Sequence, residues 1–192
     1  MKTINKFLVL FLIAVAINAQ TIPNGGFEQW SDGKPVKWAC PNEENITPIT
    51  MTNDKHSGLH AVKGQIIKME FPGMPKMLLP AAIQSGEEGK GFPINFKPSI
   101  VSGYFKFVPR GGDKLTFGVV LLQNGIDVGH DALIIKDPIT SFNQLILNIK
   151  DKFKNLTSQP DTIEISIAII GPTTGQDFHE GTYFIVDDIS IQ

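Results

Sequence analysis

Apolar and polar residues alternate with a period of two along much of this chain. The clearest case is the segment 162–169, where isoleucine occupies every odd position. Successive side chains of a β-strand point to opposite faces, so this pattern is typical of a strand with one face on a core. We therefore expect four isoleucines to be buried together: Ile163, Ile165, Ile167 and Ile169.

Other segments carry the same strand signal, and none has the apolar period of a long helix. Strong strands are predicted at 101–107, 115–122, 145–149 and 183–191, and weaker ones at 59–62, 66–71 and 132–135. Gly-rich or Pro-marked connections separate them. Residues 110–113 are interpreted as a hairpin loop, and Asn124-Gly125 is a tight-turn signal. The pattern predicts an all-β fold, an antiparallel β-sandwich of the jelly-roll type.

The first 19 residues have the features of a signal peptide. Lys2 and Lys6 precede an apolar stretch at 7–16, which is too short to span a bilayer comfortably. An interfacial or buried helix is the alternative. No cysteine follows the stretch, which argues against a lipid anchor, and no later segment is apolar enough for a membrane span. We expect residues 20–192 to form a single β-sandwich domain that is secreted, periplasmic or on the cell surface.

Charge and cysteine content exclude several classes of protein. The formal charge is −2 for the whole chain, and about −4 once the two lysines of the predicted signal peptide are removed. No basic block is present, so a nucleic-acid partner has no electrostatic support. Cys40 is the only cysteine and cannot form an internal disulfide. We interpret it as a small buried hydrophobe rather than a catalytic thiol.

Acidic residues stand at both ends of the predicted domain. Glu28 follows Phe27 near the start, and Asp187 and Asp188 interrupt an apolar strand near the end. A carboxylate in so apolar a strand is costly to bury unless it is paired or binds a metal ion. Calcium prefers carboxylate and carbonyl oxygens, so a calcium site is one interpretation. Aspartates that are exposed, or that accept backbone N–H groups, are the other.

No catalytic constellation is recognisable in the sequence. The four histidines do not have the spacing of a transition-metal site, and no nucleophile, zinc-protease or phosphate-loop motif occurs. The carboxylate pairs at 43–44 and 87–88 lie in polar loops, and adjacent residues cannot face each other across a sugar. Trp30 and Trp38 could stack on a sugar ring or could pack the N-terminal loop against the sandwich.

Three motifs in order resemble one known family. They are the segment 24–30, Asn-Gly-Gly-Phe-Glu-Gln-Trp, with Pro35 and Trp38 behind it, then 57–63, then the closing segment 184–190. Together they resemble the galactose-binding-like jelly rolls. This group includes many carbohydrate-binding modules and the carbohydrate-metabolism domains of secreted bacterial proteins. The resemblance covers nearly all of the chain after residue 19.

The resemblance implies a structural Ca²⁺ site near the two chain ends. Carried over to this sequence, the carboxylate ligands are Glu28 and one of Asp187 and Asp188. Backbone oxygens around Lys55 and Ser57 are the further expected ligands.

The resemblance also implies a glycan or polysaccharide as partner, but no motif fixes the residues that contact it. The candidates are Trp30, Trp38 and Tyr104. Tyr104 alternates out of phase with Phe105 and Phe107, which we expect to face the core, so it should project from the opposite face of its strand.

Three classes of function remain open from the sequence. We favour a secreted, non-catalytic carbohydrate-binding or adhesive module. A structural or assembly protein with the same sandwich is the second, and a glycan-active enzyme is the third. The identity of the glycan and the oligomeric state are not encoded in any motif.

Overall fold

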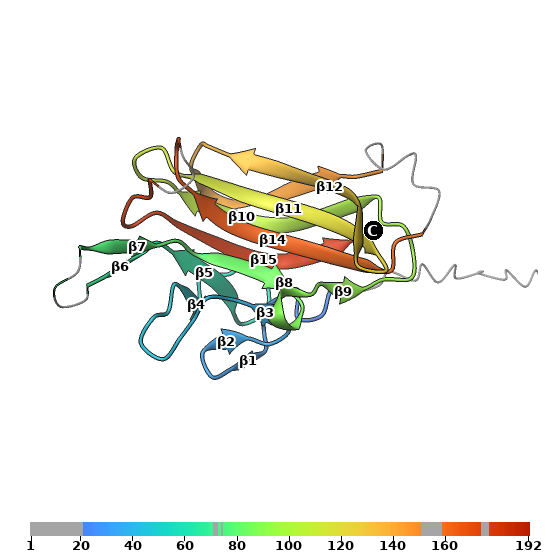
Figure 1. The fold of residues 1–192 in the computed structure, drawn as a ribbon, viewed down its shortest axis with the longest axis horizontal. Helices are drawn as coiled ribbons and strands as arrows, with labels where there is room; N and C mark the ends of the chain where they lie inside the picture. The colour runs from blue at the N-terminus through green and yellow to red at the C-terminus, as the bar shows by residue number, and fades with distance from the viewer. Residues whose placement is uncertain (1–20, 71–72, 74, 151–158, 174–176) are drawn as a thin grey trace, which may run out of the picture.

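The computed structural model describes residues 21–70, 73, 75–150, 159–173 and 177–192. Two antiparallel sheets form a sandwich (Figure 1). The five-stranded sheet has the order β13 (Ile139–Asn148), β10 (Ile100–Val108), β15 (Tyr183–Ile191), β5 (Ala61–Gln65), β4 (Ile49–Thr52). The six-stranded sheet has the order β12 (Ile126–Ile135), β11 (Lys114–Gln123), β14 (Thr162–Ile170), β8 (Ala82–Ser85), β3 (Trp38–Ala39), and β9 (Phe92–Pro93) also pairs with β14.

Two small hairpins extend the sandwich. One joins β1 (Trp30–Ser31) to β2 (Lys34–Pro35), and the other joins β6 (Ile67–Met69) to β7 (Met77–Leu79). Within the described ranges there is no α-helix, and a 3₁₀ turn at Glu87–Gly89 is the helical element that the structure contains. None of the helical structure in these ranges is long and apolar enough to cross a membrane. The fold is therefore an all-β jelly roll, as the alternation of the sequence predicts.

The core lies between the inner faces of the two sheets. The four isoleucines of β14 are buried as predicted, with at most 2% of each exposed. Phe105 and Phe107 of β10, in the opposite sheet, and Phe117 of β11, the neighbour of β14 in the same sheet, are fully buried in the same core. Burial of large apolar side chains is the main stabilising contribution for a domain that has no disulfide.

The prediction for residues 110–113 was wrong. This connection is not a hairpin loop, because β10 belongs to the five-stranded sheet and β11 to the six-stranded sheet. The loop crosses between the layers and is fixed by a buried carboxylate. Asp113 accepts a hydrogen bond from the His179 N–H at 3.1 Å, and the Arg110 N–H donates to Thr182 Oγ1 at 2.8 Å. The turn at Asn124-Gly125 does form a hairpin, between β11 and β12, with positive φ at both residues.

The last strand lies beside the N-terminal segment, as predicted. The Ile189 N–H donates to the Gly25 carbonyl at 2.8 Å. A Cβ at Gly25 would collide with the backbone of Ile189, so the close approach requires glycine. In Figure 1 the short strands β1 to β4, drawn in blue to cyan, lie below the long strands. The predicted signal peptide at 1–19 lies outside the described residues, and its cleavage stays a prediction.

Candidate functional site

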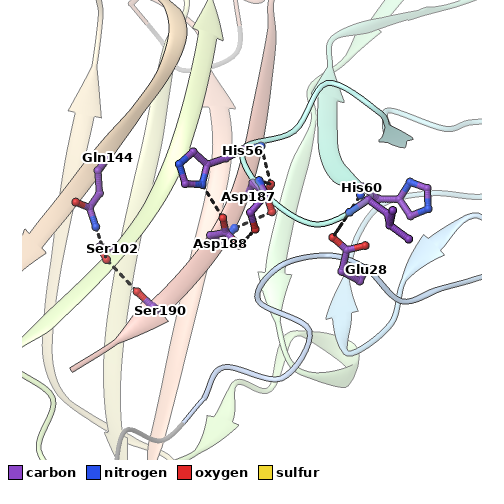
Figure 2. Close-up of polar contacts among 10 residues, drawn as sticks. Glu28, His56, His60, Ser102, Gln144, Asp187, Asp188 and Ser190 are labelled. Carbon is purple, nitrogen blue, oxygen red and sulfur yellow. Dashed lines mark hydrogen bonds and ion pairs between the residues drawn. The ribbon is translucent and has the colours of Figure 1, made fainter.

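The carboxylates of the two chain ends meet one loop, residues 56–60, between β4 and β5. Asp187 lies in β15 opposite Tyr104 and is fully buried. Its Oδ2 accepts hydrogen bonds from the N–H groups of His56 at 2.8 Å and Ser57 at 3.0 Å, and its Oδ1 accepts the Asp188 N–H at 2.8 Å. Figure 2 shows the loop drawn against these two aspartates.

Asp188 and Glu28 bind the same loop from other directions. Asp188 has a left-handed backbone, with φ of 50°, and its carboxylate contacts His56 Nδ1 at 2.7 Å and the Ser57 hydroxyl at 2.9 Å. Glu28 Oε1 accepts the N–H groups of Leu59 at 2.8 Å and His60 at 3.3 Å. We call the three carboxylates and the 56–60 loop the clasp. It joins the first and last segments of the domain through a loop far from both in sequence.

The electrostatics of the clasp follow from burial and from its N–H donors. Burial raises the pKa of the Asp187 carboxyl above its ordinary value. The backbone N–H groups of Ser57 and His56 oppose this rise in pKa, because they stabilise the ionised form. The hydrogen bonds of the clasp therefore offset part of the free-energy cost of burying the Asp187 carboxylate.

Toward the carboxylates, the 56–60 loop presents mainly hydrogen-bond donors. Calcium requires six to eight oxygen ligands. Toward the aspartates, Ser57 presents its N–H and hydroxyl groups. Over the ranges that the structure describes, no group of three or more His, Cys, Asp or Glu side chains could hold a metal ion. These N–H and hydroxyl groups fit hydrogen bonding to the carboxylates better than coordination of Ca²⁺. Calcium binding by Glu28, Lys55, Ser57, Asp187 and Asp188 stays a prediction.

Tyr104 projects from the solvent side of the five-stranded sheet, opposite to Phe105 and Phe107, as predicted. Its ring is half-buried because the His56 ring stacks on it, with centroids 3.4 Å apart and an interplanar angle of 9°. Phe142 of β13 packs edge-on against His56 at 5.9 Å. No local sequence pattern predicts this stacking, because His56 and Phe142 are distant from Tyr104 along the chain.

Polar side chains continue this outer face beside Tyr104. The hydroxyls of Ser102 and Ser190 are 3.0 Å apart, and Gln144 Nε2 donates to Ser102 Oγ at 3.4 Å (Figure 2). The face therefore combines an aromatic pair with a hydrogen-bonded polar row. Because His56 covers one side of Tyr104, only the rest of that ring is left for a ligand.

Trp38 is buried and is therefore not available as a glycan contact. It is 3% exposed and packs against Phe27 at 5.0 Å and Phe92 at 5.6 Å between ring centroids. Its Nε1 donates to the Pro23 carbonyl at 3.2 Å. The ring is part of the core and has no surface to offer a sugar.

Trp30, in contrast, lines a surface cavity of about 300 Å³. The ring is held in place because its Nε1 donates to the Phe27 carbonyl at 2.7 Å. The cavity lies between the β1–β2 hairpin and β4. Its other lining residues bring hydroxyl, carboxylate and apolar groups: Ser31, Asp32, Gly33, Thr47, Ile49, Thr50 and Met51. We call this space the Trp30 cavity.

Asn42 holds the two walls of the Trp30 cavity together. The side chain is 2% exposed, and its Nδ2 donates to the carbonyls of Gly33 at 3.0 Å and Ile49 at 2.7 Å. Its Oδ1 accepts the Ile49 N–H at 3.0 Å. Sequence reasoning missed Asn42, because an asparagine in a polar loop gives no sign of these distant partners. The cavity is therefore formed before any ligand arrives.

A cavity of about 500 Å³ brings the Glu43-Glu44 pair near Glu70. A glycan-cleaving site needs a carboxylic acid whose pKa is raised, so that it can protonate the leaving group. The hydrogen bond from Lys68 instead lowers the pKa of the Glu70 carboxyl. This cavity therefore gives no support to an acid–base pair.

Cys40 is half-buried and lines a cavity of about 370 Å³ on the outer face of the six-stranded sheet. Burial raises the pKa of its thiol, so the reactive thiolate is scarce at neutral pH. This agrees with a structural role for the residue, although it is less buried than the sequence suggested.

Comparison with known proteins establishes the fold. No family model matches the chain, and no curated protein matches its sequence. Among solved structures, a family 61 carbohydrate-binding module in complex with β-1,4-galactotriose has a TM-score of 0.55 at 13% identity, over 91% of this chain and 99% of that one. A family 28 module specific for non-crystalline cellulose has a TM-score of 0.52 at 12% identity, over 91% and 95%. An arabinose-bound α-L-arabinofuranosidase matches at a TM-score of 0.53 and 13% identity, over 90% of this chain but 26% of that one.

This chain has the galactose-binding-like jelly-roll fold of carbohydrate-binding modules. The resemblance seen in its sequence motifs is confirmed for the fold. Two of these likenesses extend over nearly the full length of a carbohydrate-binding module, whereas the likeness to the arabinofuranosidase extends over about a quarter of that enzyme.

Proposed function

We propose that this protein is a secreted, non-catalytic carbohydrate-binding module that holds its glycan at the Trp30 cavity. The observation that carries the proposal is a fixed tryptophan ring in a preformed cavity with hydroxyl and carboxylate groups around it. Ligand sites of this kind combine an apolar surface with a few polar groups that fix orientation. A tryptophan ring buries a large area of a sugar at low entropic cost.

The fold supports the same proposal. The family 61 module named above was solved with a β-1,4-galactotriose, and the family 28 module is specific for non-crystalline cellulose. Folds host many functions, so this likeness gives a class of ligand and the cavity gives the site. The signal-peptide features of residues 1–19 support export.

A glycan array with the protein from Gln20 onward tests the proposal. We expect binding to a subset of glycans, lost in Trp30→Ala and retained in Tyr104→Ala, because Tyr104 is already stacked on His56. Incubation of the bound glycans should release no reducing ends. An array without hits would favour a structural or assembly role, and measurable cleavage would overturn the non-catalytic assignment.

The outer face of the five-stranded sheet is the second candidate surface. The favourable observations are the stacked rings of Tyr104 and His56, with Phe142 packed against His56, and the polar side chains of Ser190 and Gln144, which hydrogen-bond to the buried Ser102. If this face is the site, Tyr104→Ala abolishes binding on the array and Trp30→Ala leaves it unchanged.

A further inference from the structure

The charge of the residues that line the Trp30 cavity and the volume of the cavity indicate which ligands it can bind. Asp32 and Gly33 form the two-residue turn between β1 and β2, with φ of 49° and 71°. Two successive residues with positive φ are typical of a type I′ hairpin, for which Asp-Gly is a preferred sequence. This rigid turn holds the Asp32 carboxylate at the cavity, where Asn42 fixes the Gly33 carbonyl.

Asp32 has capacity to bind a ligand hydroxyl. One of its oxygens, Oδ2, accepts the Ser31 hydroxyl at 3.1 Å. An ionised carboxylate offers about four acceptor positions, so most of them remain for a ligand. Sugar hydroxyls are hydrogen-bond donors, and a bond to a charged acceptor is stronger than one between neutral groups.

The charge of the lining is one-sided. Asp32 is the one ionisable side chain among the lining residues that the structure describes, and no Lys or Arg is among them. Among the lining residues, a negatively charged ligand would meet a carboxylate of the same sign and no cation, although Lys34 stands opposite Ser31 across the hairpin. An uncharged sugar would meet only favourable hydrogen bonds and the Trp30 ring.

The size of the cavity points in the same direction. A volume of about 300 Å³ is at the lower limit for ligand pockets. Such a space suits a mono- or disaccharide unit rather than a long stretch of polysaccharide.

Resting on the function proposed above, we propose that the Trp30 cavity binds a short, uncharged sugar unit and discriminates against uronic-acid and sulfated residues. Trp30 supplies the stacking surface, and Asp32 accepts ligand hydroxyls and excludes anions. Asn42 is a positioning residue that keeps the two walls in place.

Intrinsic fluorescence makes this testable, because Trp30 and the buried Trp38 are the only tryptophans. The probes are the methyl glycosides of glucose and galactose, the corresponding glucuronides and galacturonides, and neutral oligosaccharides of increasing length. We expect a neutral probe to change the fluorescence and the matching uronide to bind about tenfold more weakly or worse. Affinity should reach its plateau at the disaccharide.

Two variants distinguish the effect of the carboxylate at the cavity from the effect of removing a negative charge anywhere on the protein. Asp32→Asn should bring the neutral and uronide affinities to within about threefold of each other, and it should weaken neutral binding, because a neutral acceptor replaces a charged one. Asp137→Asn is the matched control. Asp137 is exposed between β12 and β13, the edge strands farthest in sheet order from β3 and β4, and should behave as wild type.

Equal binding of neutral and anionic probes by the wild-type protein would overturn the proposal, and so would a neutral–uronide ratio unchanged in Asp32→Asn. Affinity that keeps rising with chain length would overturn its size argument. These results leave the proposed function intact if glycans still bind on the array. The absence of binding to any saccharide, charged or neutral, would overturn the proposed function itself.

Discussion

Replacing Asp187 by alanine tests whether the clasp stabilises the fold. The substitution removes a fully buried carboxylate that accepts N–H groups from His56, Ser57 and Asp188. The His56 and Ser57 donors belong to a loop that is 131 and 130 positions away in sequence. Losing the acceptor should therefore weaken the link between the 56–60 loop and the last strand.

The size of the effect follows from two opposing contributions. A buried donor left without a partner costs about 1–3 kcal/mol. The N–H groups of His56 and Ser57 are partly buried, so water can replace part of what they lose. Removing the carboxylate also relieves the unfavourable burial that raises its pKa. We expect a net loss of about 2–4 kcal/mol in the free energy of unfolding, with the lost hydrogen bonds dominating.

Urea unfolding followed by tryptophan fluorescence measures this loss, because Trp38 lies in the core. For a domain of this size we expect a fall of about 10 °C in melting temperature as well. Asp137→Ala, at an exposed loop, is the control and should stay within about 0.5 kcal/mol of wild type. An unfolding free energy of Asp187→Ala within that same range would refute the clasp as a stabilising element.

Three further predictions concern the ion, the thiol and the predicted signal peptide. If the clasp binds calcium, a chelator should lower the melting temperature, because an ion that binds only the folded state stabilises it. An unchanged melting curve would contradict the calcium prediction and indicate that hydrogen bonds alone hold the clasp together. Cys40 should react with a thiol reagent more slowly at neutral pH than a free cysteine, with its rate rising at higher pH, because burial raises its pKa; a rate equal to that of free cysteine would contradict this. Mass spectrometry of the exported protein should give a chain that starts at or near Gln20, and a retained Met1 would contradict the signal peptide.

The sequence predicted those features that depend on local alternation. A period of two placed the β14 isoleucines in the core and Tyr104 on the opposite side of β10 from Phe105, since backbone geometry alone decides which face a strand residue occupies. It failed at residues 110–113, because a loop that crosses between sheets uses the same Gly-Gly-Asp signature as a hairpin.

The family resemblance implied that Glu28, Asp187 and Asp188 meet near residues 55–57, but other features that depend on distant partners could not be predicted. Trp30 and Trp38 have equivalent local sequence signals, yet one lines a cavity and the other packs between Phe27 and Phe92. Asn42 gives no local sign that it joins two walls of a cavity. These placements arise from tertiary packing, which a single sequence does not display residue by residue.

The central claim is that a glycan binds at the Trp30 cavity, and calorimetric titration of the best array glycan tests it most directly. The wild-type protein and Tyr104→Ala should give similar dissociation constants. Trp30→Ala, which loses the stacking ring, should bind at least about tenfold more weakly, corresponding to about 1.4 kcal/mol. Unchanged affinity in a folded Trp30→Ala, or no heat of binding in the wild type, would contradict the account.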